Sequence, residues 1–198
     1  VFGLAELVIY CYLGGSIGFA QSAATIADDI GLVKPTFLTA VPRVFNKIYD
    51  GLWTRMNEEG GLAKTLFVMG VESGKKKREL AEQGKSSFMV NLKFKIADAI
   101  VFKKIREKLG GRLKGSMTGS AMMNPEISHF FWDMSIPLYD AYGLTETSPG
   151  ATMNRPTKYK IGTVGPAMGL GKVVIDKSVV GEDSIDGEVI IYGPNVMQ

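Results

Sequence analysis

Residues 139–148 combine side-chain types that together can hold a nucleotide. The aromatic face of Tyr142 can stack on a base, and the carboxylate of Asp140 can accept a hydrogen bond from an exocyclic amine. The hydroxyl of Thr145 can donate to a phosphate oxygen. The carboxylate of Glu146 can bind Mg²⁺, which takes oxygen ligands and usually bridges to phosphates. The segment is therefore suited to chemistry on a nucleotide phosphate.

The position of this segment in the expected fold agrees with such a role. The apolar run 136–139 predicts a short buried strand, and ligands of open α/β sheets bind at the carboxyl ends of strands. Gly143 has no side chain, so the backbone there could approach a ligand closely. Taken alone, these residues fit equally well a plain turn that connects a strand to a loop.

The run Tyr-Gly-Leu-Thr-Glu-Thr at 142–147 resembles the signature of the adenylate-forming enzymes, which include acyl-CoA synthetases, luciferases and peptide-synthetase adenylation domains. The longer run 139–148 is most similar to long-chain fatty acyl-CoA synthetases. Other segments resemble motifs of the same enzymes: 1–6, 34–49, 62–109, 119–126, 162–166 and 187–194. The resemblance therefore covers essentially the whole chain.

The resemblance implies an adenine side to the site. The backbone of Gly119, Ser120 and Ala121 would line the adenine and ribose. Asp140 would accept a hydrogen bond from the adenine amine, and Tyr142 would pack on the adenine face. These five residues are thus expected to bind the nucleotide.

The resemblance also implies a phosphate side. Gly143 would let the loop close on the nucleotide, Thr145 would bind phosphate, and Glu146 would ligate Mg²⁺. Thr145 and Glu146 are the expected catalytic residues, because positioning and charge neutralisation dominate this kind of phosphoryl chemistry.

The reaction implied by the resemblance is that of a long-chain fatty acid–CoA ligase. A fatty acid carboxylate would attack the α-phosphorus of ATP, and the acyl-AMP would then give its acyl group to the thiol of coenzyme A. ATP, Mg²⁺ and coenzyme A are therefore the expected cofactor and cosubstrates. Two alternatives stay open: an enzyme that loads a carrier protein, and a non-catalytic member that only binds a nucleotide or lipid.

The elements that must position these residues alternate between strand and helix, which predicts an α/β fold with a mostly parallel sheet flanked by helices. Helices are expected at 3–13, 22–32, 42–59, 62–82, 88–109 and 125–134. Strands are expected at 16–20, 36–41, 112–118, 136–139, 171–176 and 187–192, with a turn at 181–186 between the last two.

The expected organisation has two parts. Residues 1–155 form an α/β subdomain that binds nucleotide and acyl group, with a helical insertion at about 62–109. Residues 156–198 begin a β-rich subdomain. Both ends of the chain fall within structured patterns, so we expect a fragment of the large N-terminal domain of an adenylate-forming enzyme. The family's phosphate loop would precede it, and the ribose aspartate, hinge and catalytic lysine would follow. The fragment alone is not expected to turn over.

Composition excludes several other classes of protein. The net charge of +3 is too small to indicate a nucleic-acid partner. Cys11 is the sole cysteine, which excludes an internal disulfide framework and fits a reducing, cytoplasmic compartment. His129 is the sole histidine and is expected to be structural, so a His/Cys metal site is not expected. The apolar run 1–20 predicts a buried helix and strand rather than a membrane span.

The segment 72–114 is strongly basic, with thirteen Lys and Arg residues against five acids. The favoured interpretation is a solvated helix face. The alternative is a surface that meets anionic lipid headgroups or the phosphates of coenzyme A. This leaves open peripheral association with the cytoplasmic face of a membrane. The sequence does not indicate an oligomeric state.

Overall fold

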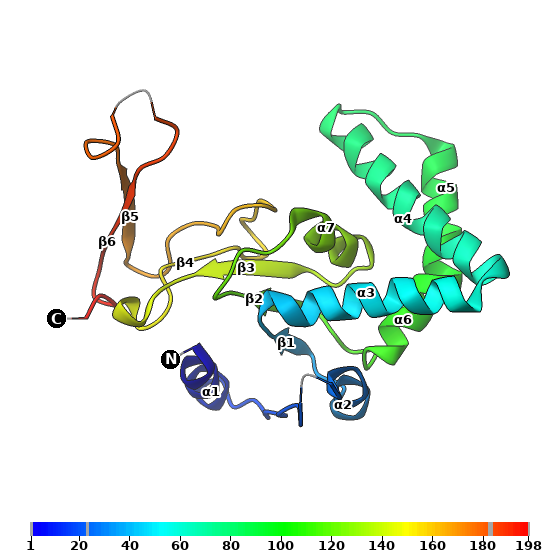
Figure 1. Cartoon of the computed structure of the whole chain (residues 1–198), viewed down its shortest axis with the longest axis horizontal. Coiled ribbons are helices and arrows are strands. Elements are labelled where there is room, and N and C mark those ends of the chain that lie inside the picture. Colours follow the sequence, from blue (N-terminus) through cyan, green and yellow to red (C-terminus); the bar gives the residue numbers. More distant parts are fainter. Residues whose placement is uncertain (1, 23, 182–183, 198) are drawn as a thin grey trace. The chain divides into compact units, whose positions relative to one another are not determined.

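The computed structural model describes residues 2–22, 24–181 and 184–197, which form two compact units (Figure 1). Unit 1 comprises Val1–Ile17, Thr118–Ala121 and Tyr139–Gln198. Unit 2 comprises Gly18–Met117 and Met122–Leu138. The chain therefore passes between the units several times.

Unit 2 is mainly helical and carries two short parallel strands, in which Leu38 lies opposite Ser116. Its elements in order are α2 (Ile26–Val33), β1 (Phe37–Thr39), α3 (Pro42–Glu59), α4 (Gly61–Glu82), α5 (Phe88–Ala97), a π-helical segment (Asp98–Phe102), α6 (Lys103–Lys108), β2 (Gly115–Thr118, whose last residue belongs to unit 1) and α7 (Pro125–Asp133).

Local sequence signals explain where these helices begin and end. Asn124 precedes α7, and its side-chain oxygen accepts from the backbone N–H of Glu126 at 2.9 Å. Pro125 occupies the first turn, where a missing N–H costs nothing. After α6 the chain turns through Gly110, whose φ of +90° and close approach to the backbone of Lys34 leave no room for a side chain.

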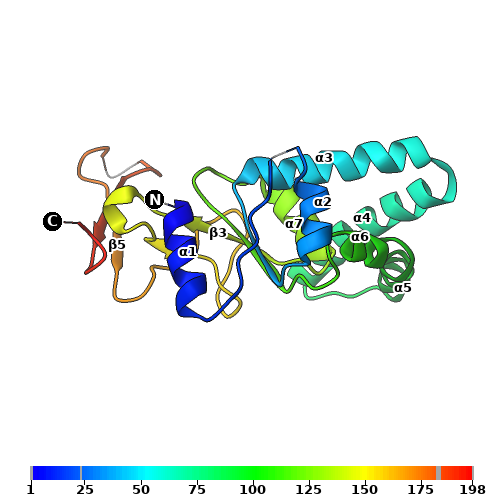
Figure 2. The ribbon, with the colours of Figure 1, turned by 90° about the horizontal axis from the view of Figure 1, so that it is seen from below.

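Aromatic side chains fill the core of unit 2. Phe45, Phe67, Phe102 and Phe131 are among its most deeply buried side chains. The rings meet edge to face, with centroids 5.5 Å apart for Phe45 and Phe131 and 6.3 Å apart for Phe67 and Phe102. Figures 1 and 2 show α4, which carries Phe67, side by side with α5.

Unit 1 contains α1 (Phe2–Tyr12) and several short strands. They are β3 (Leu138–Tyr142, whose first residue belongs to unit 2), β4 (Thr152–Met153), β5 (Lys172–Asp176) and β6 (Glu188–Tyr192). In this unit β3 pairs with β4 in antiparallel orientation, and β5 and β6 form a separate antiparallel hairpin. A 3₁₀ turn (Thr145–Thr147) lies between β3 and β4.

Most of the expected elements are confirmed, with three corrections to the elements themselves. The burial expected for the helix in the run 1–20 is wrong, because Leu7, Val8, Ile9 and Tyr12 of α1 are exposed. Residues 16–20 form no strand: the chain there is irregular, and a Cβ at Gly18 would lie 2.7 Å from a methyl carbon of Val33, so the backbone passes close to α2 instead of pairing. The expected helix 88–109 is interrupted by the π-helical segment. Part of the expected turn at 181–186 lies outside the described residues.

The third correction concerns the site. We expected the strand to end at Tyr139, but β3 continues to Tyr142 because Ala141 and Tyr142 pair with Met153 and Thr152 of β4. The expected boundary between subdomains near residue 155 stays a prediction. Among the described helices, none has the length and apolarity needed to cross a bilayer.

Candidate functional site

The residues with expected site roles all lie in unit 1, although they come from two distant parts of the sequence. Gly119, Ser120 and Ala121 follow β2, whereas the others lie on β3 and in the turn after it. Ser120 has a φ of +69°, a left-handed conformation that few non-glycine residues adopt, and its side chain is exposed. The chain therefore bends sharply at the end of β2 and presents Ser120 and Ala121 to solvent.

Asp140 is a half-buried carboxylate on β3. Burial raises the pKa of its carboxyl to about 6. Its backbone oxygen accepts from the N–H of Asn154 at 2.9 Å. Within the part of the chain that the structure describes, no donor reaches the carboxylate itself. An outside group that donates a hydrogen bond would relieve the cost of this burial.

Gly143 begins the signature turn, which we define as residues 143–150. A Cβ at Gly143 would collide with the carbonyl oxygen of Pro149 and lie 3.0 Å from the Cα of Gly150. The backbone N–H of Ala151 closes the turn by donating to the oxygen of Tyr142 at 2.9 Å. The absent side chain of Gly143 therefore serves the closure of the turn, a role distinct from the expected approach to nucleotide.

The hydroxyl of Thr147 stabilises the turn from inside. Thr147 is buried, and its Oγ1 accepts from the N–H of Leu144 at 2.9 Å and donates to the oxygen of Pro149 at 2.9 Å. Thr145 and Glu146 precede it on the 3₁₀ turn and are exposed. The two residues that are expected to meet phosphate and metal thus face solvent, while the second threonine is structural.

Asn195, which sequence analysis missed, ties the signature turn to the segment after β6. Its amide nitrogen donates to the carbonyl oxygens of Thr147 at 3.2 Å and of Gly150 at 2.9 Å. The N–H of Met197 donates to the oxygen of Glu146 at 2.8 Å. The only sequence signal was its place in a Gly-Pro-Asn turn, which does not reveal the acceptors.

Asn154 is a second residue that sequence analysis missed. It is buried at the end of β4, and its side chain spans the following loop by donating to the oxygen of Thr163 and accepting from the N–H of Lys160 at 3.0 Å. A Cβ at Gly165 would collide with the backbone of Asn154. The expected motif 162–166 thus folds back onto β4, beside the strand that carries Asp140.

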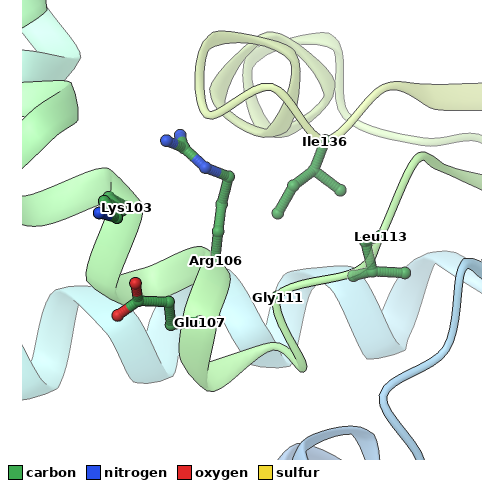
Figure 3. A pocket seen from close by; sticks show the side chains of 6 residues that line it. All are labelled: Lys103, Arg106, Glu107, Gly111, Leu113 and Ile136. Atoms are coloured by element: carbon green, nitrogen blue, oxygen red, sulfur yellow. The ribbon is translucent and has the colours of Figure 1, made fainter.

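Other parts of the molecule offer less to a nucleotide. A pocket of about 180 Å³ in unit 2 contains none of the expected site residues; it is lined by Lys103, Arg106, Glu107, Gly111, Leu113 and Ile136 (Figure 3). The guanidinium of Arg106 is already paired with Asp98 at 2.6 Å and with the oxygen of Met134 at 3.1 Å. Among the described residues, no three His, Cys, Asp or Glu side chains group as a metal site.

Comparison with known sequences identifies a family. A model described as AMP-binding enzyme matches residues 1–198. Fatty acyl-CoA synthetase A of Dictyostelium discoideum is 33% identical over 205 residues, covering 100% of this chain and 29% of that protein. Long chain acyl-CoA synthetase 8 of Arabidopsis thaliana is 34% identical over 211 residues, covering 97% of this chain and 28% of that protein. The chain thus spans less than a third of these relatives.

Solved structures share the fold. An o-succinylbenzoate CoA synthetase of Bacillus subtilis, in complex with its acyl-adenylate intermediate, has a TM-score of 0.58 and 15% identity, covering 99% of this chain and 30% of that one. The same synthetase with ATP and a magnesium ion has a TM-score of 0.57, again with 15% identity, covering 99% of this chain and 31% of that one. These likenesses confirm the expected α/β fold.

The collision at Gly143 makes a prediction about stability. We expect Gly143→Ala to open the signature turn and to lower the free energy of unfolding by roughly 1–3 kcal/mol, as overpacking does elsewhere. Gly51→Ala is the matched control, because a Cβ there meets nothing within 4 Å and the site lies inside α3. The control should be stabilised by about 0.5–1 kcal/mol. Urea unfolding would measure both, and an unchanged Gly143→Ala variant would contradict the geometry.

The two bonds from Asn195 make a second prediction. We expect Asn195→Ala to loosen the turn, with a loss of about 1–3 kcal/mol from two unpaired carbonyl groups. Hydrogen exchange should then accelerate at the amides of 144–151 more than elsewhere in unit 1. Asn91→Ala, which removes an exposed bond to Ser86, is the control and should leave those amides unchanged. Equal hydrogen-exchange rates at these amides in both variants would show that the bonds from Asn195 do not stabilise the turn.

Proposed function

Because the chain belongs to the AMP-binding enzyme family, we propose that the full-length protein is a long-chain fatty acid–CoA ligase. The observation that carries the proposal is the signature turn, which exposes Thr145 and Glu146 while Gly143, Thr147 and Asn195 hold the backbone. The relatives named fatty acyl-CoA and long chain acyl-CoA synthetases, which the chain matches over nearly its whole length, support the acyl group and the acceptor.

The proposed reaction has two steps. A fatty acid carboxylate oxygen attacks the α-phosphorus of ATP, and pyrophosphate leaves with the electrons of the broken P–O bond. The thiol sulfur of coenzyme A then attacks the acyl carbonyl, loses its proton, and displaces AMP. Use of ATP agrees with the B. subtilis structure that contains ATP and magnesium. Because the first step needs little covalent help from the protein, the site chiefly positions reactants and stabilises charge.

On the adenine side, the features of Asp140 fit a ligand amine. Its carboxylate is half-buried and has no donor among the described residues, so an adenine amine would supply the missing hydrogen bond. Tyr142 would pack on the adenine face from the same strand. The bend at Ser120 would place the backbone of Gly119 and Ala121 along the adenine and ribose.

On the phosphate side, Thr145 would donate its hydroxyl to a phosphate oxygen. Glu146 would hold Mg²⁺, because it is an exposed carboxylate with no ion pair in the described parts of the chain. The metal, when bound, would neutralise phosphate charge. Holding the turn rigid matters here, since hydrogen bonds that are placed before the reaction cost no reorganisation during it.

Several further features belong to the same proposal. The enzyme would act in the cytoplasm, with peripheral association at the cytoplasmic face of a membrane, where long-chain acids partition. Residues 1–155 would form the nucleotide- and acyl-binding subdomain and 156–198 the start of a β-rich one.

The alternative function is an acyl-adenylate enzyme that loads a carrier protein. It would share the first step and differ only in its acyl acceptor.

The test is fatty-acid-dependent AMP release by the full-length protein, with acids from acetate to oleate, with and without coenzyme A. We expect long acids to release AMP fastest and coenzyme A to accelerate the release. Glu146→Ala should slow it at least about a hundredfold, as loss of one charge-stabilising group does in other enzymes. Glu58→Ala, which changes an exposed acid of α3 in unit 2, is the matched control.

Three outcomes would count against parts of the proposal. A rate of AMP release that does not change when coenzyme A is added would indicate a different acyl acceptor. A full rate in Glu146→Ala would remove its metal role. The absence of AMP with every acid would contradict catalysis and leave a nucleotide-binding protein.

The raised pKa of Asp140 predicts opposite pH trends for folding and for binding. The folded pKa of about 6 lies above the ordinary value of 3.8, so the folded state holds this proton more tightly. Stability from this group should be full below the ordinary pKa and decline as pH rises through about 6. AMP affinity should instead rise over this range, being roughly tenfold weaker one unit below the folded pKa.

Asp140→Asn separates these effects, because asparagine keeps an acceptor oxygen but does not titrate. Calorimetric titration with AMP should lose in this variant the part of its pH dependence that Asp140 causes, and keep the part that comes from ionisation of the AMP phosphate at about pH 6. Inosine monophosphate, which lacks the exocyclic amine, tests the contact directly and should bind the unmodified protein more weakly than AMP. Equal affinities for the two nucleotides would show that Asp140 does not meet the amine.

A further inference from the structure

Helix α5 has an inner face that is fully engaged with α4. The ring of Phe94 lies under the ammonium group of Lys77, whose Nζ is 4.8 Å from the ring centroid. Ala97 is completely buried, and a Cβ at Gly70 of α4 would lie 2.8 Å from its methyl group. This face therefore packs α5 against α4.

The outer face of α5 is apolar and exposed. The spacing of four between Phe88, Leu92, Ile96 and Ile100 places them along one side of the helical run, with Met89 beside them. Their exposed fractions are 80% for Phe88, 58% for Met89 and 41% for both Leu92 and Ile96. Ile100 is 45% exposed. We call these five residues the apolar stripe.

Lysines border this stripe on both sides. At 3.6 residues per turn, Lys95 lies at one edge of the stripe and Lys93 at the other, and both are exposed. Lys85 precedes the helix, and no acidic residue occurs between 83 and 97. The first acid beyond it, Asp98, is paired with Arg106. The outer face therefore carries uncompensated positive charge beside exposed hydrocarbon.

The stripe continues into a groove. Ile100 lines a cavity of about 310 Å³ together with residues of α3, α4 and α6. Leu62 and Leu66 supply apolar walls, and Leu62 is 74% exposed. Lys104 and Lys108 also line the groove, together with the ion pair between Arg55 and Glu59. Apolar surface bordered by lysines thus extends from the first turn of α5 to the first turn of α4.

We propose that the apolar stripe docks unit 2 on a bilayer that contains anionic lipids, with α5 lying in the interface. An amphipathic helix with lysines flanking an apolar face binds in this way, through buried hydrocarbon and attraction to anionic headgroups. A symmetric contact between two copies is disfavoured, because it would bring the lysines of both stripes together. The surface gives a location to the peripheral association proposed above and does not depend on the ligase activity.

The test is flotation of the full-length protein with vesicles of pure phosphatidylcholine and with vesicles of about one third phosphatidylserine. We expect binding to the anionic vesicles that weakens with salt. The double variant Lys93→Glu/Lys95→Glu should weaken that binding by at least about tenfold, and so should Leu92→Gln/Ile96→Gln. Lys114→Glu/Lys177→Glu is the control of equal charge change at exposed sites outside the stripe.

Other outcomes would overturn the proposal. Equal binding of all variants would place the contact elsewhere. Weaker binding confined to Leu92→Gln/Ile96→Gln, with lower thermal stability of that variant and unchanged binding of Lys93→Glu/Lys95→Glu, would assign the loss to folding and overturn the docking surface. A dimer that these substitutions dissociate would make the stripe a contact between copies. AMP release without vesicle binding would leave the proposed ligase intact and remove only the docking surface, so the two failures are distinguishable.

Discussion

The backbone contact between Gly143 and Pro149 is the constraint on which the candidate site depends. Two main-chain segments pass so closely there that no side chain fits between them. Once the turn closes, Thr147 faces inward and its hydroxyl satisfies backbone groups. Thr145 and Glu146 then face solvent on the same 3₁₀ turn. The exposure of Thr145 and Glu146 is therefore a consequence of main-chain packing.

Two partly buried aspartates differ in whether the protein itself supplies a hydrogen-bond donor to the carboxylate. Burial raises the pKa of Asp133 in unit 2 and of Asp140 in unit 1. Asp133 has a partner, because Arg78 of α4 donates to it and offsets part of the desolvation. Asp140 has no such donor among the described residues. A carboxylate that is buried yet left without a partner is suited to a ligand that brings one.

Local sequence signals predicted the helices well. Strands and long-range side-chain hydrogen bonds were harder to predict, because they depend on partners that are distant in the sequence. The cap at Asn124 and the proline after it specify the start of α7 without reference to the rest of the chain. Residues 16–20 had the composition of a strand but pair with none, and β3 gained residues because β4 pairs with it. Asn195 meets Thr147 across 48 residues, a separation that no local pattern encodes.

The outer face of α5 carries apolar residues that stay exposed in the described part of the chain. The aromatic core of unit 2 is closed without the rings of the apolar stripe: Phe67 and Phe102 are fully buried and meet one another, and Phe102 meets Phe94 on the inner face of α5. Exposed hydrocarbon that folding does not use is uncommon over several turns of one helix, and usually marks a surface that binds something. Its lysines narrow the choice of partner, because placing them against a neutral or basic surface would gain no electrostatic attraction. An anionic lipid surface satisfies both the apolar residues and the charges without requiring any change in the packing of α4 and α5.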